Sequence, residues 1–355
     1  MTHAAIIGVG SYLPSRRLTN ADLERMVETS DEWIVTRTGI RERRLAEEGQ
    51  ATSDLAAEAG TAALADAGVS PDEVDLLVVG TSSPDMVFPS SACLAQVKMG
   101  LRCAALDVNA ACTGFVYALH HGTAAIESGR ARTVLVVGAD ALTRHLDFDD
   151  RSTCVLFGDG AGAVVLRASE EPGVLGIALG ADGGGAEMLK IPAGGSALPC
   201  TTERCEQGLQ YVKMAGNEVF KFAVRVIPKV TNEALAASGL SPADMRWLIP
   251  HQANQRILDT VAERLGVPSA CVFSNVSMLG NTSAASIPLA IDELYTGGDL
   301  VPGDVLALVG FGAGVTWGAA VVRWTRGASA RSAVSVLNGA DAASHPVKGS
   351  PSKEA

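Results

Sequence analysis

Three residues in this chain of 355 have side chains suited to nucleophilic catalysis: Cys112, His251 and Asn281. Cys112 lies in the segment 109–114 (NAACTG), between a short predicted strand and a helical pattern that starts near Phe115. The free N–H groups and the dipole at a helix N-terminus would lower the pKa of the thiol and favour a thiolate nucleophile. The alternative is a small buried apolar cysteine, because a nucleophile also needs a base nearby.

His251 and Asn281 are the candidates for assisting that nucleophile. His251 follows the apolar stretch 247–250, and α/β proteins place their sites at strand ends. The alternative is a histidine whose ring bonds only to neighbouring backbone. Asn281 precedes an apolar helix that ends near Tyr295, and the alternative for it is an ordinary helix N-cap.

The elements that must position these residues follow an internal repeat. Short apolar strands alternate with Ala-rich helical segments, which predicts an α/β fold with buried sheets. Three pairs of segments resemble each other in the same order along the chain: 63–77 and 234–248, 134–138 and 306–310, and 163–167 and 319–323. The repeat predicts two similar halves, residues 1–170 and 171–326, followed by a flexible tail at 327–355.

The repeat also relates the candidate residues to one another. Asn281 lies 169 residues after Cys112, so we expect it at the equivalent turn, and His251 falls at the strand end that matches Gly80. Pseudo-twofold packing of the halves would bring the Cys, the His and the Asn together in the middle of the molecule. A glycine-rich segment at 310–314 follows a predicted strand and offers backbone N–H groups to an oxyanion.

Composition and charge exclude several other classes of protein. The 28 Lys and Arg residues against 39 Asp and Glu give a net charge of −11, which excludes a general nucleic-acid binder. Seven scattered cysteines do not resemble a disulfide framework, and without a leader sequence they predict a cytoplasmic protein. The uncharged stretch 305–322 predicts two buried strands joined by a glycine turn, not a membrane span. The glycine segments 8–10 and 158–162 lack the remaining residues of nucleotide-binding loops.

Two surface patterns could bind ligands or partners. Trp33 and Arg37 lie four apart on a helix whose capping box begins at Thr29. They form either a simple stacking pair or a platform for a ring and a phosphate. On a predicted helix, a basic residue recurs every four positions from Lys221 to Lys229. This basic stripe is either an ordinary solvent-exposed helix face or a docking site for an acidic partner.

Taken together, these motifs resemble the β-ketoacyl-acyl-carrier-protein synthases of type III, in the thiolase-like superfamily, over about residues 4–326. The segments that carry the resemblance are 29–41, 110–115, 157–162, 214–220, 250–254, 280–286 and 310–318. The resemblance implies a five-layered αβαβα fold of two similar halves and a homodimer. It also implies that Phe88 reaches the acyl pocket of the partner subunit.

The roles implied by the resemblance form a two-stage reaction. Cys112 would take the acyl group from an acyl-CoA primer, so acyl-CoA is a substrate, and neither a separate cofactor nor a metal is expected. His251 and Asn281 would bind the thioester carbonyl of malonyl-carrier protein and stabilise the enolate formed as carbon dioxide leaves. The backbone N–H groups of Cys112 and Ala313 would hold the oxyanion of the condensation step. Ala313 departs from a loop that is often all glycine in the family, but a backbone donor survives that change.

The resemblance also implies three sets of binding residues. CoA and substrate contacts fall on Thr29, Trp33, Arg37, Arg151, Gly216, Phe220 and Asn254. The acyl pocket falls on Phe88, Leu189 and Phe311, and docking of an acidic carrier protein falls on Lys221, Gln252, Ala253, Asn254, Gln255 and Arg256. Glu263 beside Arg264 departs from the more basic pair expected there, which leaves the choice of carrier protein open.

Three other functions are consistent with some of these features. A starter-unit acyltransferase of a polyketide or secondary-metabolite pathway shares the fold and the acyl-cysteine. Papain-like peptidases also order Cys, His and Asn along the chain, but their motif around the cysteine is absent. A non-catalytic dimeric carrier-protein binder would not need Cys112. Neither the length and branching of the primer nor the pathway follows from the sequence.

Overall fold

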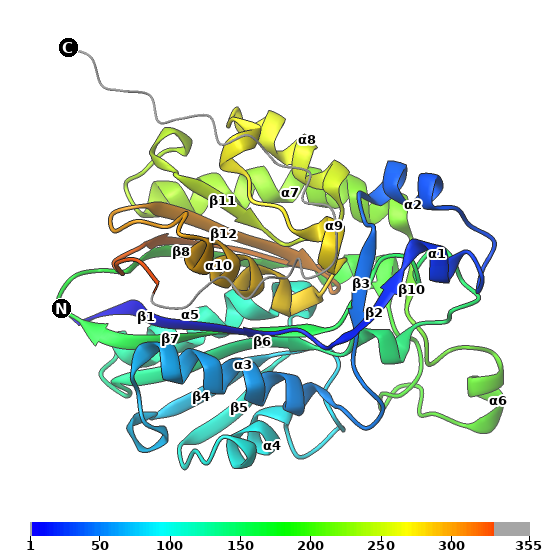
Figure 1. Cartoon of the computed structure of the whole chain (residues 1–355), viewed down its shortest axis with the longest axis horizontal. Helices are drawn as coiled ribbons and strands as arrows, with labels where there is room; N and C mark the ends of the chain where they lie inside the picture. Colours follow the sequence, from blue (N-terminus) through cyan, green and yellow to red (C-terminus); the bar gives the residue numbers. More distant parts are fainter. Residues whose placement is uncertain (1, 330–355) are drawn as a thin grey trace.

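The computed structural model describes residues 2–329. Three layers of helices alternate with two β-sheets, so that each sheet lies between two helical layers (Figure 1). Helices α3 and α4 cover the outer face of one sheet, α7 and α8 cover the outer face of the other, and α5 and α10 lie between the sheets. The predicted five-layered αβαβα fold is therefore confirmed. The part of the predicted tail from residue 330 to residue 355 lies outside the described residues.

The first sheet has the strand order β1-β7-β6-β4-β5. Its strands are β1 (His3–Tyr12), β4 (Leu76–Gly80), β5 (Ala104–Val108), β6 (Thr133–Asp140) and β7 (Gly160–Ser169). Strands β4, β5 and β6 run parallel, whereas β7 is antiparallel to both β6 and β1. The helices α3 (Thr52–Ala67) and α4 (Ser91–Lys98) pack on it through small and apolar residues. The approach is close, because a Cβ at Gly10 would lie 2.3 Å from the backbone nitrogen of Ala63 in α3.

The second sheet repeats this arrangement with four strands in the order β11-β12-β13-β8. They are β8 (Val174–Ala181), β11 (Trp247–Pro250), β12 (Val305–Gly312) and β13 (Thr316–Arg323), and the outer helices are α7 (Gly216–Ala237) and α8 (Gln255–Leu265). Leu77 of β4 pairs with Leu135 of β6, and the repeat-related Leu248 pairs with Ala307. The stretch 305–322 thus forms two buried antiparallel strands, as predicted. The proposed division near residue 170 falls between β7 and β8.

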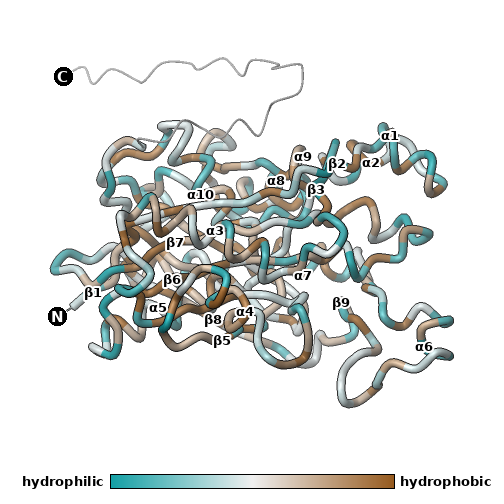
Figure 2. The backbone as a smooth tube through the Cα atoms, turned by 60° about the horizontal axis from the view of Figure 1, so that its bottom comes forward, coloured by the Kyte–Doolittle hydropathy of each residue, from teal (hydrophilic) through white to brown (hydrophobic). Residues whose placement is uncertain are grey.

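The middle layer consists of α5 (Gly114–Glu127) and α10 (Ser286–Gly297). Both helices are apolar on most faces because both sheets bury them, and their side chains join the largest core cluster of the molecule. Figure 2 shows the hydrophobic colouring concentrated along β6 and β7 inside the molecule. None of the helices within residues 2–329 is long and apolar enough to cross a membrane.

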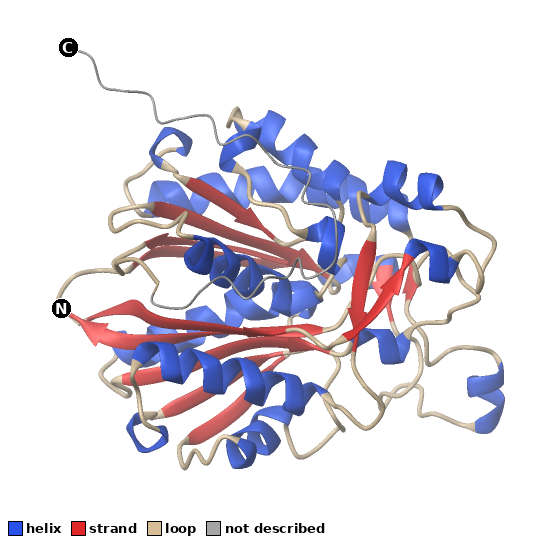
Figure 3. Cartoon of the chain, in the orientation of Figure 1, coloured by secondary structure: helices blue, strands red, loops and turns tan. Residues whose placement is uncertain are grey.

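Shorter elements gather beyond the carboxyl ends of the parallel strands and surround the site (Figure 3). They are β2 (Arg16–Thr19), α1 (Asn20–Leu23), α2 (Asp31–Thr38), β3 (Glu42–Leu45), β9 (Leu189–Lys190), α6 (Thr202–Glu206), β10 (Lys213–Met214) and α9 (Val276–Leu279). Two single-turn 3₁₀ helices, η2 (Ala111–Thr113) and η7 (Ser283–Ala285), lead into α5 and α10. Each half therefore places a turn at the start of its middle-layer helix; the first turn follows strand β5, and the second follows helix α9.

Candidate active site

Cys112 lies on η2, in the turn that carries the chain from β5 into α5. Ala111 before it has a φ of 47°, a left-handed conformation that is uncommon for a residue with a Cβ and that makes the turn sharp. The end of β12 packs directly against this turn, because a Cβ at Gly312 would lie 2.7 Å from the Cys112 nitrogen. The side chain of Cys112 is only 6% exposed, and its accessible atoms face a cavity.

The expected acidic thiol is not what the structure produces. Burial raises the pKa of Cys112 to about 12, the neighbouring Ser283 side chain partly offsets this rise, and the charge of Asp140 adds to it. Removing the thiolate from water costs more than the helix N-terminus is expected to return. The prediction of a lowered pKa is therefore wrong, and Cys112 rests as a neutral thiol that must lose its proton during attack.

His251 stands at the end of β11, where its backbone N–H donates to Val309 O at 2.7 Å. The ring is 1% exposed, and its Nδ1 lies 2.7 Å from the Ser286 hydroxyl at the start of α10. The ring of Phe311 packs edge-on against it, with 5.5 Å between the centroids. Burial lowers the pKa of His251 to about 3, so the imidazole is neutral at physiological pH.

Two backbone hydrogen bonds fix the position of Asn281. Its N–H donates to Leu156 O at 2.8 Å, and its carbonyl accepts from the Gly158 N–H at 3.0 Å. The side-chain Oδ1 accepts from the Ser283 N–H at 2.9 Å. The Nδ2 group has no hydrogen-bond acceptor within residues 2–329, so its two protons are left for the cavity.

The repeat relates Asn281 to a different residue than expected. Ser283 has a φ of 51° and opens η7, just as Ala111 opens η2. Aligning these two left-handed residues makes Ala284 the equivalent of Cys112, and Asn281 the equivalent of Asn109. The predicted equivalence of Asn281 and Cys112 is wrong by three residues, because the two turns present different positions to the same space.

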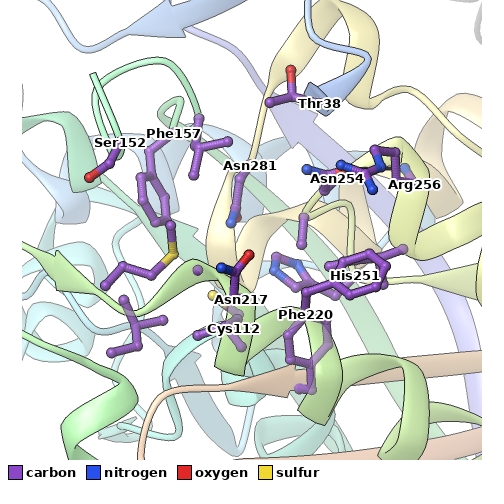
Figure 4. A pocket seen from close by; sticks show the side chains of 18 of the residues that line it. Thr38, Cys112, Ser152, Phe157, Asn217, Phe220, His251, Asn254, Arg256 and Asn281 are labelled. Carbon is purple, nitrogen blue, oxygen red and sulfur yellow. Dashed lines mark hydrogen bonds between the residues drawn. The ribbon is translucent and has the colours of Figure 1, made fainter. Parts of the chain in front are cut away.

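The three side chains line one cavity of about 450 Å³ (Figure 4). Cys112 comes from the first half of the chain, whereas His251 and Asn281 come from the second. In the close-up view they surround a common space from three directions. A neutral thiol therefore faces a neutral imidazole and an amide group that can donate hydrogen bonds. That arrangement can hold an acyl group on sulfur and stabilise a negative oxygen beside it.

The cavity opens between α2, α7 and α8, beside a cluster of ring and guanidinium groups. The guanidinium groups of Arg37 and Arg151 lie 4.6 Å and 5.0 Å from the Trp33 ring centre. The predicted residues Trp33, Arg37, Gly216, Phe220 and Asn254 all line the cavity. Arg151 reaches it only through Trp33, and its Nη1 donates to Glu28 O at 2.8 Å. The hydroxyl of Thr29 is buried without a partner among the described residues and does not line the cavity. The predicted capping box at Thr29 is wrong, because Ser30 caps α2 and its hydroxyl accepts from the Trp33 N–H at 3.1 Å.

A second cavity of about 440 Å³ extends from the other side of Cys112. Its lining is mostly apolar and comprises Ala110, Ala111, Leu142, Phe157, Leu189, Ile191, Val212 and Ala313, among others. Leu189 lines both cavities, and Phe311 lines the first. Phe88 lines neither within this single chain, and its side chain is 81% exposed.

Of the predicted docking residues, Ala253, Asn254 and Arg256 line the first cavity, whereas Lys221, Gln252 and Gln255 do not. Lys221 is exposed and pairs with Glu218 at 2.9 Å, and the exposed Arg256 lies 5.6 Å from the Phe220 ring. Ala253, Asn254 and Gln255 are partly buried. Gln252 is 1% exposed, and its amide donates to Pro250 O and Phe273 O and accepts from the Asn275 N–H. The expectation that Gln252 contacts a docked protein is therefore wrong, because this side chain holds its own loop together.

Two contributors to the site were missed by reasoning from the sequence. Ser283 lies beside the Cys112 thiol and is fully buried. Asp140, at the end of β6, accepts from the Ser82 N–H at 2.8 Å and the Ser83 N–H at 3.0 Å. Its other oxygen accepts from the Ala284 N–H at 3.1 Å, so it connects the first half to η7 of the second. The only signal in the sequence was an acidic residue at the carboxyl end of a predicted buried strand.

Comparisons with known proteins show which family this chain resembles. The family model described as 3-oxoacyl-[acyl-carrier-protein (ACP)] synthase III matches residues 106–183, and its C-terminal counterpart matches residues 235–324. A protein of Caldanaerobacter subterraneus subsp. tengcongensis named beta-ketoacyl-[acyl-carrier-protein] synthase III is 50% identical over 91% of this chain and 98% of its own length.

Two solved structures extend the comparison to the fold. The 3-oxoacyl-[acyl-carrier-protein] synthase III of Aquifex aeolicus is 44% identical, with a TM-score of 0.84 over 91% of this chain and 100% of that one. The priming beta-ketosynthase of a polyketide biosynthetic pathway is 36% identical, with a TM-score of 0.85 over 91% and 96% of the two chains. With this identity along nearly the whole length of its relatives, the chain belongs to the 3-oxoacyl-[acyl-carrier-protein] synthase III family.

Proposed function

We propose that this protein catalyses the decarboxylative condensation of an acyl-CoA primer with malonyl-acyl-carrier protein, giving a 3-oxoacyl-acyl-carrier protein and so starting an acyl chain. The observation that carries the proposal is the single cavity shared by Cys112, His251 and Asn281. A thiol can hold the primer there while two neutral side chains stabilise the negative charge that develops on the extender. The chain acts as an acyltransferase of the condensing class.

The first stage loads the primer on Cys112. The sulfur attacks the thioester carbonyl of acyl-CoA, the carbon–sulfur bond to CoA breaks, and the thiol proton ends on the CoA sulfur. Because the pKa of Cys112 is raised to about 12, proton loss accompanies attack instead of preceding it. The loaded acyl chain extends into the second, apolar cavity past Leu189 and Phe157.

The second stage forms the carbon–carbon bond. The carboxylate of the malonyl thioester leaves as carbon dioxide, and its electron pair becomes an enolate whose oxygen receives hydrogen bonds from His251 and Asn281. The enolate carbon then attacks the acyl-Cys112 carbonyl. The backbone N–H groups of Cys112 and Ala313 hold the resulting oxyanion until the thiolate of Cys112 departs.

The rim of the first cavity supports binding of both carriers. Trp33, with the guanidinium groups of Arg37 and Arg151 close to its ring, would offer an aromatic surface and two cations to an adenine ring and phosphates. Gly216, Phe220 and Asn254 would line the path of the pantetheine arm. Lys221 and Arg256 would receive the acidic carrier protein, since both are exposed cations, Arg256 lines the cavity, and Lys221 follows the lining residue Phe220 on α7.

We further propose that the protein is a homodimer joined along β5. This strand lies at the edge of its sheet, so one row of its backbone groups is free to pair with another strand. The exposed apolar side chains of the molecule gather near it, including Met86, Val87, Phe88, Val97 and Leu106. A second copy would cover this surface, and Phe88 would then enter the partner's acyl cavity.

A starter-unit transferase is the second candidate, and one observation favours it. The priming beta-ketosynthase noted above comes from a polyketide biosynthetic pathway and matches this fold as well as the 3-oxoacyl-[acyl-carrier-protein] synthase III of Aquifex aeolicus does. A starter-unit transferase would pass the Cys112 acyl group to another acceptor and would need no enolate. The retained Asn281, with its amide protons directed into the cavity, favours condensation.

Release of carbon dioxide separates these functions. Purified protein is mixed with acyl-CoA and carboxyl-labelled malonyl-carrier protein, and we expect label in the gas phase together with a 3-oxoacyl product detected by mass spectrometry. Acylation of Cys112 without release of label would contradict condensation and support the transferase. No acylation at all would leave only a binding role. A cytoplasmic location and independence from a cofactor stay predictions.

A further inference from the structure

Ser286 opens α10 with its hydroxyl against the ring of His251. The distance from Ser286 Oγ to His251 Nδ1 is 2.7 Å, and both side chains are 1% exposed. The backbone N–H of Gln252 donates to the same hydroxyl oxygen at 3.4 Å. No other hydrogen bond of the Ser286 side chain occurs within residues 2–329.

Counting protons at this hydroxyl decides which atom donates. A serine hydroxyl has one proton to give and two lone pairs to receive with. If His251 Nδ1 carried a proton, the oxygen would receive two donors while its own buried proton had no acceptor. If Ser286 donates to Nδ1, all three groups are satisfied, and buried polar groups are rarely left otherwise.

We propose that Ser286 is a positioning residue that keeps the proton of His251 on Nε2, so that the ring presents an N–H donor to the cavity. For catalysis this rests on the proposed function, because the donor would serve the enolate oxygen. The opposite tautomer would aim a lone pair at that negative oxygen. No proton moves in the step, since His251 stays neutral and donates a hydrogen bond only.

The same turn orients the second donor. The Ser283 N–H occupies Oδ1 of Asn281, which leaves the amide Nδ2 as the group that faces the cavity. Residues 283–286 therefore set the polarity of both side chains, one through a backbone N–H and the other through a hydroxyl. A site built this way prefers an anionic oxygen over a neutral hydroxyl or ammonium group.

Nuclear magnetic resonance tests the tautomer independently of any activity. The full-length protein is produced with isotope-labelled histidine, and long-range proton–nitrogen spectra identify the tautomer of each of the six rings. His251→Gln assigns the signal. We expect His251 to be protonated on Nε2 in the wild type, with the ratio of the two tautomers falling at least about tenfold in Ser286→Ala. A proton on Nδ1 in the wild type, or an unchanged ratio in the variant, would overturn the proposal.

Kinetics test the consequence. In Ser286→Ala we expect release of carbon dioxide from malonyl-carrier protein to fall about 10- to 100-fold, less than the loss of a whole donor, with acylation of Cys112 within about twofold of wild type. Ser286→Thr retains a hydroxyl and should restore most of the rate. Thr296→Ala removes another hydroxyl of α10, which donates to Asp292 O at 2.7 Å, and should change neither step.

Three further outcomes of these experiments also test the role of Ser286. An equal loss of both steps in Ser286→Ala would mean a structural role and overturn the proposal. If Ser286→Ala does not fold, Ser286→Cys replaces the hydroxyl by a weak donor of similar shape and is judged by the same criteria. A wild type that never releases carbon dioxide would contradict the proposed function, while the spectra would still judge the tautomer.

Discussion

The two turns that lead into the middle-layer helices have similar backbone conformations but present different side chains to the site. Each turn opens with a left-handed residue, Ala111 or Ser283, and enters a helix of the middle layer. The first turn presents its second residue, Cys112, as a nucleophile. The second presents Asn281, which precedes the turn, as a donor. A duplicated fold thus acquired two functions by exposing different positions of one motif.

The strand ends beside these turns differ in the same way. Gly80 ends β4, and a Cβ there would lie 2.5 Å from the carbonyl carbon of Gly114, so the first half has no room for a side chain. At the equivalent positions of the second half, His251 and Ser286 are joined by a hydrogen bond. In the first half, the close approach of β4 to the start of α5 favours a tight turn at the nucleophile. In the second half, the wider spacing between β11 and α10 leaves room for the imidazole of His251.

The largest effect should come from the nucleophile itself. Cys112→Ser should lower primer acylation by roughly 10⁴-fold or more, because a serine hydroxyl without an activating base is a far weaker nucleophile. Mass spectrometry of the intact protein after incubation with acyl-CoA measures this. Cys93→Ser, at a partly buried cysteine on α4, is the matched control and should acylate normally. Normal acylation of Cys112→Ser would contradict the assignment.

The donor turn should affect only the second stage. Asn281→Ala should slow decarboxylation of malonyl-carrier protein about 10²- to 10³-fold by removing one donor, and it should spare acylation. Asn109→Ala changes the equivalent residue of the first half and should have a much smaller effect. Equal slowing of both stages by Asn281→Ala would indicate a structural role instead.

Adding one methyl group should test the close approach in the first half. Gly80→Ala must displace the backbone at Gly114, so we expect a loss of about 1–3 kcal/mol in the free energy of unfolding together with slower acylation. Chemical denaturation gives the first quantity and mass spectrometry the second. Gly195→Ala, where a Cβ meets open space, should change neither. A stable and fully active Gly80→Ala would show that the contact is not needed.

The buried imidazole should make stability depend on pH. The pKa of His251 is about 3 in the folded protein against 6.5 when unfolded, so the unfolded state binds more protons between these values. The free energy of unfolding should therefore fall as pH decreases below 6.5, by about 1.4 kcal/mol per unit. Between pH 7 and pH 5, we expect His251→Gln to lose about 2 kcal/mol less than wild type in denaturation experiments. Identical losses would mean that the ring is charged, or hydrated, in the folded state.

The smallest predicted effect concerns exposed basic residues on the outer helices α7 and α8 of the second half. Reversing Lys221 and Arg256 to Glu should weaken carrier-protein binding about tenfold, and more at low salt, with CoA binding less affected. Titration calorimetry with the carrier protein measures this. The double reversal of Arg130 and Arg132, both exposed in the first half, is the control. Unchanged affinity would remove Lys221 and Arg256 from the docking face.

Features that depend on local spacing could be predicted from the sequence. The repeat located β4, β6, β11 and β12, because buried parallel strands are short apolar runs with marked ends. Cys112 and His251 were found for the same reason, since each follows such a run. The fold class and the family likewise follow from motifs read along the chain.

Features that depend on distant contacts could not be predicted. The pKa of Cys112 rises because the sheets bury it, and burial of that degree is a property of the whole fold. The equivalence of Asn281 failed because offset alone does not show which residue of a turn is left-handed. Ser286 is an unremarkable helix residue until its contact with His251, 35 positions earlier, is known. Gln252 gave no sign that its amide is used by its own loop.

The carboxylate of Asp140 has a consequence for how this protein can evolve or be recombined. One carboxylate oxygen accepts a hydrogen bond from the backbone N–H of Ala284 in the second half. The other oxygen accepts from the backbone N–H groups of Ser82 and Ser83, in the loop after β4 of the first half. A chimaera that took its first 170 residues from another condensing enzyme would still contain His251 and Asn281. It would lose the hydrogen bond that holds the nearby turn at Ala284 unless the donated portion had an acidic residue at the position of Asp140. The two halves are thus coupled through this carboxylate, and an exchanged half must supply its equivalent.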